Sequence, residues 1–248
     1  MHLKNSNSSI NKGILYLIPT VLGNTPPAEV LPASVLFLLS TLKHYIVEDI
    51  RTARRFLKKA GSPVPIDSIK FSELNKYTHK EKLTEFLEDT AKGSDTGLIS
   101  EAGAPCIADP GSSIVAIAHK KGIRVVPLAG PSSITLALMA SGLNGQSFTF
   151  HGYLPVRSSE RNRVIKKIEQ ESANRNQAQI FMETPYRNMQ LTDALTLVCK
   201  PLTNLCIACD ITLESEFIST RTIAEWKKNR PDINKRPAIF ILQSVTGK

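Results

Sequence analysis

The stretch Ser100-Glu-Ala-Gly-Ala-Pro-Cys-Ile-Ala-Asp-Pro-Gly111 and, one strand later, Gly130-Pro-Ser-Ser133 decide the fold. Each is a loop of small residues that directly follows an apolar, strand-like run, at 97–100 and 123–128. Small residues let backbone amides come close to a ligand, and ligands of open α/β sheets bind outside the carboxyl ends of the strands. Together the loops predict a single ligand cleft. Either loop alone is also compatible with an ordinary strand-to-helix turn.

The rest of the chain alternates strand and helix patterns, which is typical of βαβ units and a mostly parallel sheet. Apolar runs predict strands at 14–18, 45–48, 96–100, 123–127, 147–150, 179–182, 204–210, 216–219 and 238–243. Helices are expected between them, among them 33–41, 51–60, 80–92, 110–121, 132–140 and 158–171. Near residue 130 the alternation begins again with more strands in succession. The pattern therefore predicts two α/β domains, 1–127 and 128–248, the second with a mixed sheet.

Composition indicates an ordinary globular protein, because 42% of the 248 residues are hydrophobic and 21% are charged. No apolar run approaches 18 residues, so we expect no transmembrane helix. The polar start, 1–9, lacks the apolar core of a signal peptide and predicts a frayed arm. Cys206 and Cys209 have CxxC spacing but lie in a strand-like run, with no second pair to complete a zinc site. We expect no metal, reduced thiols and a cytoplasmic location.

The net charge of +9 favours a polyanionic partner. Basic residues cluster at 51–59, 157–167 and 221–236. In the first cluster Arg51 and Arg55 share one face of the predicted helix and Arg54 lies beside them. Arg54 and Arg55 are therefore candidates for nucleic-acid binding. A solvated helix face would explain any one cluster, but three clusters in one small protein raise the case for nucleic acid.

Six blocks resemble the tetrapyrrole methylase family, and within it the cytidine 2′-O-methyltransferases of small-subunit ribosomal RNA. The blocks are 15–24, 47–57, 100–111, 126–133, 148–155 and 181–187, the last reading Phe181-Met-Glu-Thr-Pro-Tyr-Arg187. The resemblance implies two α/β domains with the active cleft between them, S-adenosylmethionine (SAM) as methyl donor, and a homodimer. It further implies 2′-O-methylation of a ribose in 16S ribosomal RNA, with ribosomal RNA or the small ribosomal subunit as partner.

The resemblance assigns SAM to the backbone of the two loops and to an adenine-binding surface farther along the chain. The loop residues are Ser100, Glu101, Ala102, Gly103, Ala104, Gly130, Pro131, Ser132 and Ser133. Met182, Pro237 and Ala238 are expected to pack on the adenine, although Met182 is equally compatible with a core position.

Methyl transfer to a ribose hydroxyl requires near-attack geometry and a group that takes or steers the proton. Asp49 and Arg51 follow one predicted strand end, and Glu183 and Arg187 follow another. We predict that the two carboxylates handle the proton and that the two arginines position phosphate or ribose. The alternative is that these residues form structural ion pairs. His151 is expected to be a buried, hydrogen-bonded histidine.

Three departures from the family pattern bear on the substrate. The branch has Glu-Asp-Thr-Arg where this chain has Glu48-Asp-Ile-Arg51, and Ser-Asp-Ala-Gly-Thr-Pro where it has Ser100-Glu-Ala-Gly-Ala-Pro105. An Arg-Glu-Leu-Thr-Lys run is replaced by Cys209-Asp-Ile-Thr-Leu213, which removes two cations. Methylation of a small tetrapyrrole-like molecule and SAM binding without catalysis therefore remain as alternatives. The first loop, Pro19-Thr-Val-Leu-Gly-Asn24, differs from the Gly-rich, acid-ended loop of the porphyrinoid enzymes and favours RNA.

Overall fold

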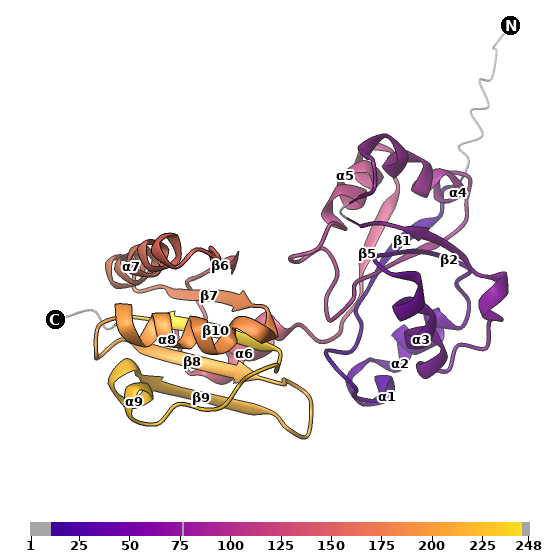
Figure 1. Ribbon diagram of the computed structural model, residues 1–248. Helices are drawn as coiled ribbons and strands as arrows, with labels where there is room; N and C mark the ends of the chain where they lie inside the picture. Colours follow the sequence, from indigo (N-terminus) through magenta and orange to yellow (C-terminus); the bar gives the residue numbers. More distant parts are fainter. Residues whose placement is uncertain (1–10, 76, 245–248) are drawn as a thin grey trace, which may run out of the picture. The chain divides into compact units, whose positions relative to one another are not determined.

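The computed structural model describes residues 11–75 and 77–244; the N-terminal arm expected at 1–9 lies outside them. The chain divides into two compact units, Met1–Pro131 (unit 1) and Ser132–Lys248 (unit 2), each of which is α/β (Figure 1). The sequence-based division fell after residue 127. Leu128 belongs to unit 1 because its N–H donates to the carbonyl of Leu17 at 3.0 Å and its side chain packs on the core of that unit.

Unit 1 is built on a five-stranded sheet in which every pair of neighbours is parallel, in the order β3-β2-β4-β1-β5. The strands are β1 (Ile14–Ile18), β2 (His44–Val47), β3 (Lys70–Glu73), β4 (Thr96–Ile99) and β5 (Arg124–Pro127). The sequence did not predict β3, because this edge strand is half-buried or exposed throughout and has no apolar run. Since all five strands run the same way, their carboxyl ends meet at one edge.

Helices cover both faces of this sheet, because alternate residues of β1 point to opposite sides. Ile18 packs on one side with Val35 and Leu57, and Leu15 packs on the other with Ile114. The helices are α1 (Pro27–Val30), α2 (Ala33–Leu39), α3 (Ile50–Lys59), α4 (Glu88–Ala91) and α5 (Ser112–Lys120), with 3-10 turns η1 (Ile66–Ser68) and η2 (Lys80–Leu87). The single helix predicted at 80–92 is thus η2 followed by α4.

Unit 2 contains a mixed five-stranded sheet in the order β6-β7-β10-β8-β9. The strands are β6 (Phe148–Tyr153), β7 (Ala178–Glu183), β8 (Asn204–Cys209), β9 (Phe217–Thr222) and β10 (Ala238–Gln243). β6 and β7 are parallel, whereas β10 runs antiparallel to both β7 and β8. The carboxyl ends of β6, β7 and β8 and the amino end of β10 therefore meet at one edge.

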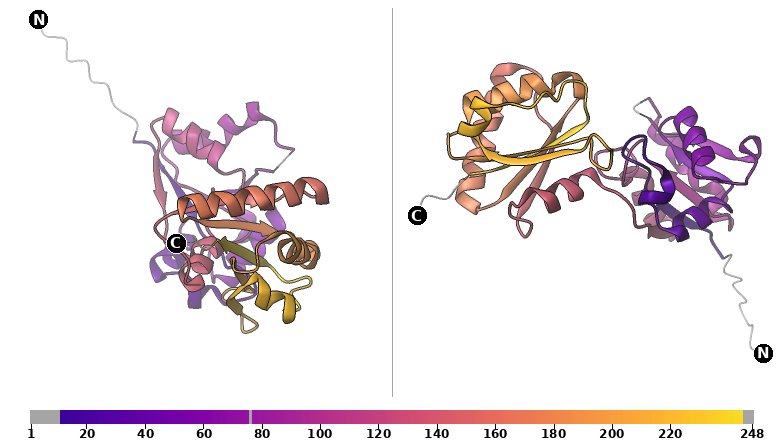
Figure 2. Two further views of the ribbon diagram at one scale, coloured as in Figure 1. Left: turned by 90° about the vertical axis from the view of Figure 1, so that its left-hand side faces the viewer. Right: turned by 90° about the horizontal axis from the view of Figure 1, so that it is seen from below.

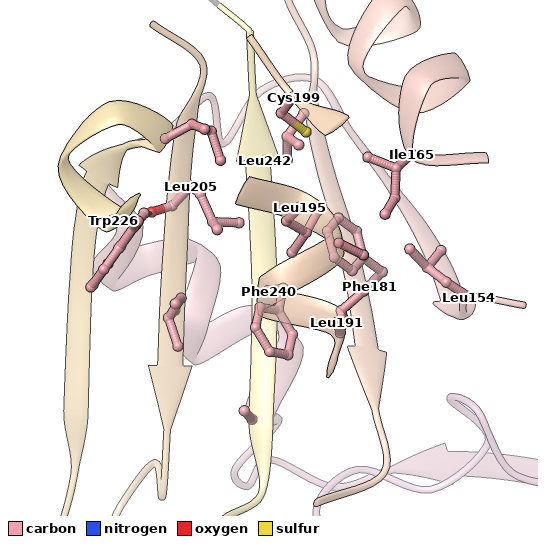
Figure 3. Packing of buried hydrophobic residues seen from close by; sticks show 14 of the residues in the cluster. Leu154, Ile165, Phe181, Leu191, Leu195, Cys199, Leu205, Trp226, Phe240 and Leu242 are labelled. Carbon is pink, nitrogen blue, oxygen red and sulfur yellow. Dashed lines mark hydrogen bonds between the residues drawn. The ribbon is translucent and has the colours of Figure 1, made fainter. Parts of the chain in front are cut away.

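The helices of unit 2 divide between the two faces of its sheet (Figure 2), with α6 on one face and the other three on the opposite face. They are α6 (Ser133–Ser141), α7 (Ser158–Arg175), α8 (Asn188–Val198) and α9 (Ile223–Lys228), with a 3-10 turn η3 (Pro185–Arg187). Figure 3 shows the core under α7, α8 and α9, where Phe181 stacks on Phe240 with ring centroids 6.0 Å apart. The buried Trp226 indole donates to the carbonyl of Leu205 at 2.8 Å.

Three of the four cysteines, Cys199, Cys206 and Cys209, are buried core residues, and Cys106 is half-buried in a loop. Cys206 and Cys209 are fully buried in β8, which confirms the strand expected there. Burial raises the pKa of the Cys209 thiol to about 11, so this thiol stays protonated near neutral pH. Across 11–75 and 77–244, no three His, Cys, Asp or Glu side chains are grouped in a way that could hold a metal ion. Over the same residues no helix is both long and apolar enough to cross a membrane.

Candidate functional site

At the carboxyl edge of the unit 1 sheet, the loops after β1 and β4 are joined by hydrogen bonds. The N–H of Thr20 donates to the carbonyl of Gly103 at 3.0 Å, and its hydroxyl donates to the carbonyl of Ser100 at 3.3 Å. The Ser100 hydroxyl closes its own loop by donating to the carbonyl of Gly103 at 2.7 Å. Gly103 has φ +74°, a left-handed conformation that favours glycine.

The loop after β5 lies against the loop after β1. A Cβ built on Gly130 would lie 2.2 Å from Cγ of Pro19, a distance that real Cβ atoms do not reach. Glycine is therefore required at 130 because the Pro19 ring packs closely on its Cα, and not because of an unusual φ. The sequence singled out two glycine loops, 100–104 and 130–133. Residues 100–104 and the start of the second loop, 130–131, thus lie at one edge with Pro19 and Thr20 between them.

Beside these loops lies a pocket of about 230 Å³. One wall comes from the loops after β1 and β4, and the other from α3, along its length from Thr52 to Lys59. The lining residues are Thr20, Val21, Leu22, Gly23, Asn24, Val47, Thr52, Ala53, Arg55, Phe56, Lys59, Ile99, Ser100, Glu101 and Ala102. Mostly apolar walls thus carry one carboxylate and two cations.

The cations of α3 differ in how they are held. The Lys59 ammonium donates to the backbone carbonyl of Asn24 at 2.9 Å and to its side-chain oxygen at 2.8 Å, which ties the first loop to the helix. The Arg54 guanidinium lies over the ring of Phe71, 5.7 Å from its centroid. Arg51 and Arg55 are exposed, and only Arg55 of the three arginines lines the pocket.

Four carboxyl groups lie near this edge, and their environments set their pKa values apart. Asp49 caps α3, and its hydrogen bonds with Thr52, including the backbone N–H at 2.7 Å, hold its pKa below the usual value. Burial raises the pKa of Glu101 and of Asp109. Burial, followed by the charges of Asp109 and Glu101, raises the pKa of Glu48.

The sequence prediction chose Asp49 and passed over its neighbour Glu48 and the more distant Asp109. The Asp109 carboxylate accepts the N–H groups of Cys106 at 2.8 Å and Gly111 at 2.7 Å. The Asp109-Pro-Gly111 run could have indicated this carboxylate, because Asp in a turn commonly accepts hydrogen bonds from nearby backbone amides.

In unit 2, Glu183 and Arg187 form a tight ion pair at the end of β7. Glu183 Oε1 accepts the N–H of Thr184 at 2.7 Å, and Arg187 Nε at 3.0 Å and Nη2 at 2.6 Å. The Glu183 side chain is fully buried and that of Arg187 is 29% exposed. Glu183 Oε2 is buried and has no hydrogen-bond partner within the described residues. This acceptor is open to a donor from a ligand or a water molecule.

A second ion pair lies at the same edge, in the stretch that departs from the family pattern. Arg236 Nε donates to Asp210 Oδ2 at 2.7 Å, and Arg236 Nη2 donates to the carbonyl of Ser215 at 2.5 Å. The carbonyl of Arg236 in turn accepts from the buried amide of Asn188 at 2.6 Å. A guanidinium from the start of β10 thus lies beside the loop that lacks the family's Arg and Lys.

The remaining predicted residues also lie in unit 2. Met182 is half-buried opposite Ile239, and Ala238 pairs with Glu183, so both lie beside the buried ion pair. Pro237 accepts the N–H of Asp210 at 3.0 Å. Ser132 is the N-cap residue of α6, which begins at Ser133.

His151, in β6, is half-buried and its Nε2 lies 2.6 Å from Oε1 of Gln179. This is a hydrogen-bonded histidine, as the sequence suggested, although it is less buried than expected.

Comparison with known proteins identifies the family. Residues 33–227 match the family described as Tetrapyrrole (Corrin/Porphyrin) Methylases. The chain belongs to this family. It is 30% identical over 234 residues to "Ribosomal RNA small subunit methyltransferase I" of Haemophilus influenzae, covering 93% of this chain and 78% of that protein. The protein of the same name from Escherichia coli O157:H7 is 30% identical over 244 residues, covering 97% and 80%.

Among solved structures, the methyltransferase CobJ superposes with a TM-score of 0.62 at 15% identity, covering 94% of this chain and 95% of CobJ. At that identity the likeness concerns the fold alone. As a tetrapyrrole methylase with these relatives, the chain is a SAM-dependent methyltransferase.

The residues present are compatible with SAM, which joins a sulfonium cation to apolar and hydrogen-bonding groups. The unit 1 pocket combines apolar walls with the carboxylate of Glu101. In unit 2 the open acceptor of Glu183 lies on the same strand pair as Ala238.

Proposed function

We propose that this tetrapyrrole methylase 2′-O-methylates a ribose in 16S ribosomal RNA. The observation that carries the proposal is the 30% identity, over 93% and 97% of this chain, to two proteins named as ribosomal RNA small subunit methyltransferases. With ribosomal RNA as the substrate, we infer a cytoplasmic site of action. The exposed arginines of α3 beside the unit 1 pocket support a phosphate-bearing acceptor.

SAM supplies an electrophilic methyl group for in-line transfer. We propose that the backbone of 100–104 and 130–133 holds its amino-acid and ribose parts. Met182, Pro237 and Ala238 would pack on the adenine. The positive φ of Gly103 supports this assignment, because glycine leaves the loop backbone without a side chain at that point. Gly130 allows the loop after β5 to lie against Pro19 of the loop after β1.

The carboxylates have different parts in this scheme. Asp49, held ionised by its bonds to the first turn of α3, would attract the hydroxyl proton of the acceptor and fix the start of the helix that carries Arg51. Glu101 has a raised pKa and lines the pocket, so we add it to Asp49 as a candidate proton acceptor. Glu183 would hold Arg187 in place, leaving the outer part of that guanidinium for ribose or phosphate.

A methyl-transfer assay with tritiated SAM tests the proposal directly. Assembled small ribosomal subunits, naked 16S RNA and a cobalt-free corrinoid precursor serve as parallel acceptors. We expect label in the RNA, in an alkali-resistant dinucleotide that marks a methylated 2′-hydroxyl. Label only in the corrinoid would establish the small-molecule alternative. Calorimetric SAM binding without transfer to any acceptor would indicate a binding protein.

The arginines of α3 provide a test of the RNA surface. Replacing Arg54 and Arg55 by Ala should weaken RNA binding. Arg54→Ala alone, at a residue outside the pocket lining, should leave SAM binding unchanged. The slope of log affinity against log salt should fall by about 0.7 for each lost contact to single-stranded RNA. Filter binding at several salt concentrations measures the RNA affinity and its salt slope. Lys120→Ala with Arg124→Ala removes two charges at the amino edge and should leave the slope unchanged. If the salt slope is the same in both double variants, the arginines of α3 do not contact RNA and form a solvated helix face.

We further propose a homodimer, as the family resemblance implies. Light scattering at micromolar concentration should give about twice the 27.3 kDa of the chain. A mass near 27.3 kDa would contradict the dimer.

A further inference from the structure

The first turn of α7 in unit 2 has no side-chain cap. This 18-residue helix begins at Ser158 with Arg157 as its N-cap residue, and no side chain within 11–75 or 77–244 caps its first amides. By contrast, Thr222 and Glu225 form a complete capping box at the start of α9. The first N–H groups of an α-helix have no partner inside the helix and carry partial positive charge. The start of α7 therefore presents amides suited to an anion.

A buried guanidinium lies at the same turn. Arg161 is 7% exposed, and its Nη1 donates to the carbonyl of Val156 at 3.5 Å, in the turn that precedes the helix. Side chains of a helix lean toward its N-terminus, which brings this guanidinium to the first turn. Its Nε is buried without a hydrogen-bond partner among the residues described. A buried donor of a cationic group requires an acceptor, and the described residues supply none to this Nε.

The neighbouring side chains fit an anion of phosphate geometry. Ser158 and Ser159 are exposed in the first turn. Glu160 would compete for the amides, but its carboxylate lies 3.7 Å from the exposed guanidinium of Arg157. One helix start thus combines uncapped amides, two hydroxyls and two guanidinium groups. This is the donor set that proteins use for phosphate.

We propose that the start of α7 binds a phosphodiester of the substrate RNA, with Arg161 as its buried anchor. The inference rests on the proposed function. Because α7 follows β6, its start lies at the edge where the parallel strands β6 and β7 both end. That edge also carries Arg187, so the phosphate would be held on the same side of unit 2 as the residue proposed to position the acceptor. Exposed Arg163 and Lys166 continue the basic surface along the helix.

Ser159→Asp separates binding from folding. An acidic residue in the first turn favours the helix, because it complements the partial positive charge there, but it repels a phosphate at the same place. We expect the affinity for a small-subunit RNA fragment to fall at least fivefold and the salt slope to become shallower. The thermal midpoint should hold or rise, and SAM binding by calorimetry should be unchanged. Asn174→Asp adds the same charge in the last turn of α7 and should leave RNA affinity within twofold.

Arg161→Lys tests the anchor. Lysine keeps the charge but loses the planar donors, so RNA affinity should fall while Arg175→Lys, at the other end of the helix, has no effect. Inorganic phosphate should compete with RNA for the wild type and not for Ser159→Asp. If Ser159→Asp binds RNA like the wild type but no longer responds to phosphate, the site takes free phosphate and the RNA assignment is overturned. If Ser159→Asp matches the wild type in every assay, the site is refuted while the proposed function stands. If the wild type binds no ribosomal RNA, both fall.

Discussion

Replacing Arg187 by Met is expected to lower the free energy of unfolding of unit 2 by about 3 kcal/mol and to abolish methyl transfer. The substitution removes the only side-chain partner that the structure describes for the fully buried Glu183 carboxylate. Breaking a buried pair on one side costs about 3–5 kcal/mol because the remaining charge stays desolvated. Denaturation followed by the fluorescence of Trp226, the single tryptophan, reports on this unit.

Two further variants separate the effect of the unpaired Glu183 charge from the effect of the packing lost with the Arg187 side chain. Adding Glu183→Gln to Arg187→Met neutralises the orphaned carboxylate and should restore part of the stability but none of the activity. Arg230→Met removes a guanidinium from the exposed pair with Asp193 and should change stability by at most about 0.5 kcal/mol. If Arg187→Met is as mild as Arg230→Met, the buried pair is not a structural element of unit 2.

Most of the fold was predictable because each buried strand is marked in the sequence by a run of apolar residues. The run 14–18 is β1 without a change of boundary, since its apolar residues feed the cores on both faces of the sheet. The edge strand β3 had no such signal. Among the strands it pairs with β2, at the edge of the sheet, and its side chains are not fully buried. Strand formation there depends on a neighbour distant in sequence, which local pattern does not contain.

The sequence indicated which residues belong to the site better than it indicated which of them contact one another. Both glycine loops were identifiable, and the order of the parallel strands, β4-β1-β5, explains why they lie on either side of the loop after β1. The sequence could not show that Glu183 is engaged by Arg187, or that Arg236 reaches Asp210 from another segment. It also gave no sign that Arg161 differs from the other basic residues of α7, because burial of one arginine depends on the turn that precedes the helix.

Gly130→Ala is expected to reduce SAM affinity at least about tenfold, equivalent to about 1.4 kcal/mol, and to destabilise unit 1 by about 1–3 kcal/mol. The added methyl group would lie 2.2 Å from Cγ and 2.6 Å from Cβ of Pro19, whose ring cannot rotate away. One of the two loops must therefore shift. Titration calorimetry with SAM measures the first effect and scanning calorimetry the second.

The matched control is Gly145→Ala, because a Cβ at Gly145 meets no atom within 4 Å. It makes the same chemical change in a loop that we do not assign to SAM, and it should leave both measurements close to wild type. Loss of SAM affinity in Gly130→Ala with an unchanged unfolding transition would support a direct effect on the binding loop. Equal loss in the two variants would show that any added methyl group disturbs the protein. Normal SAM binding by a folded Gly130→Ala protein would remove this loop from the proposed site, because a shift of the backbone that cradles the ligand cannot be neutral.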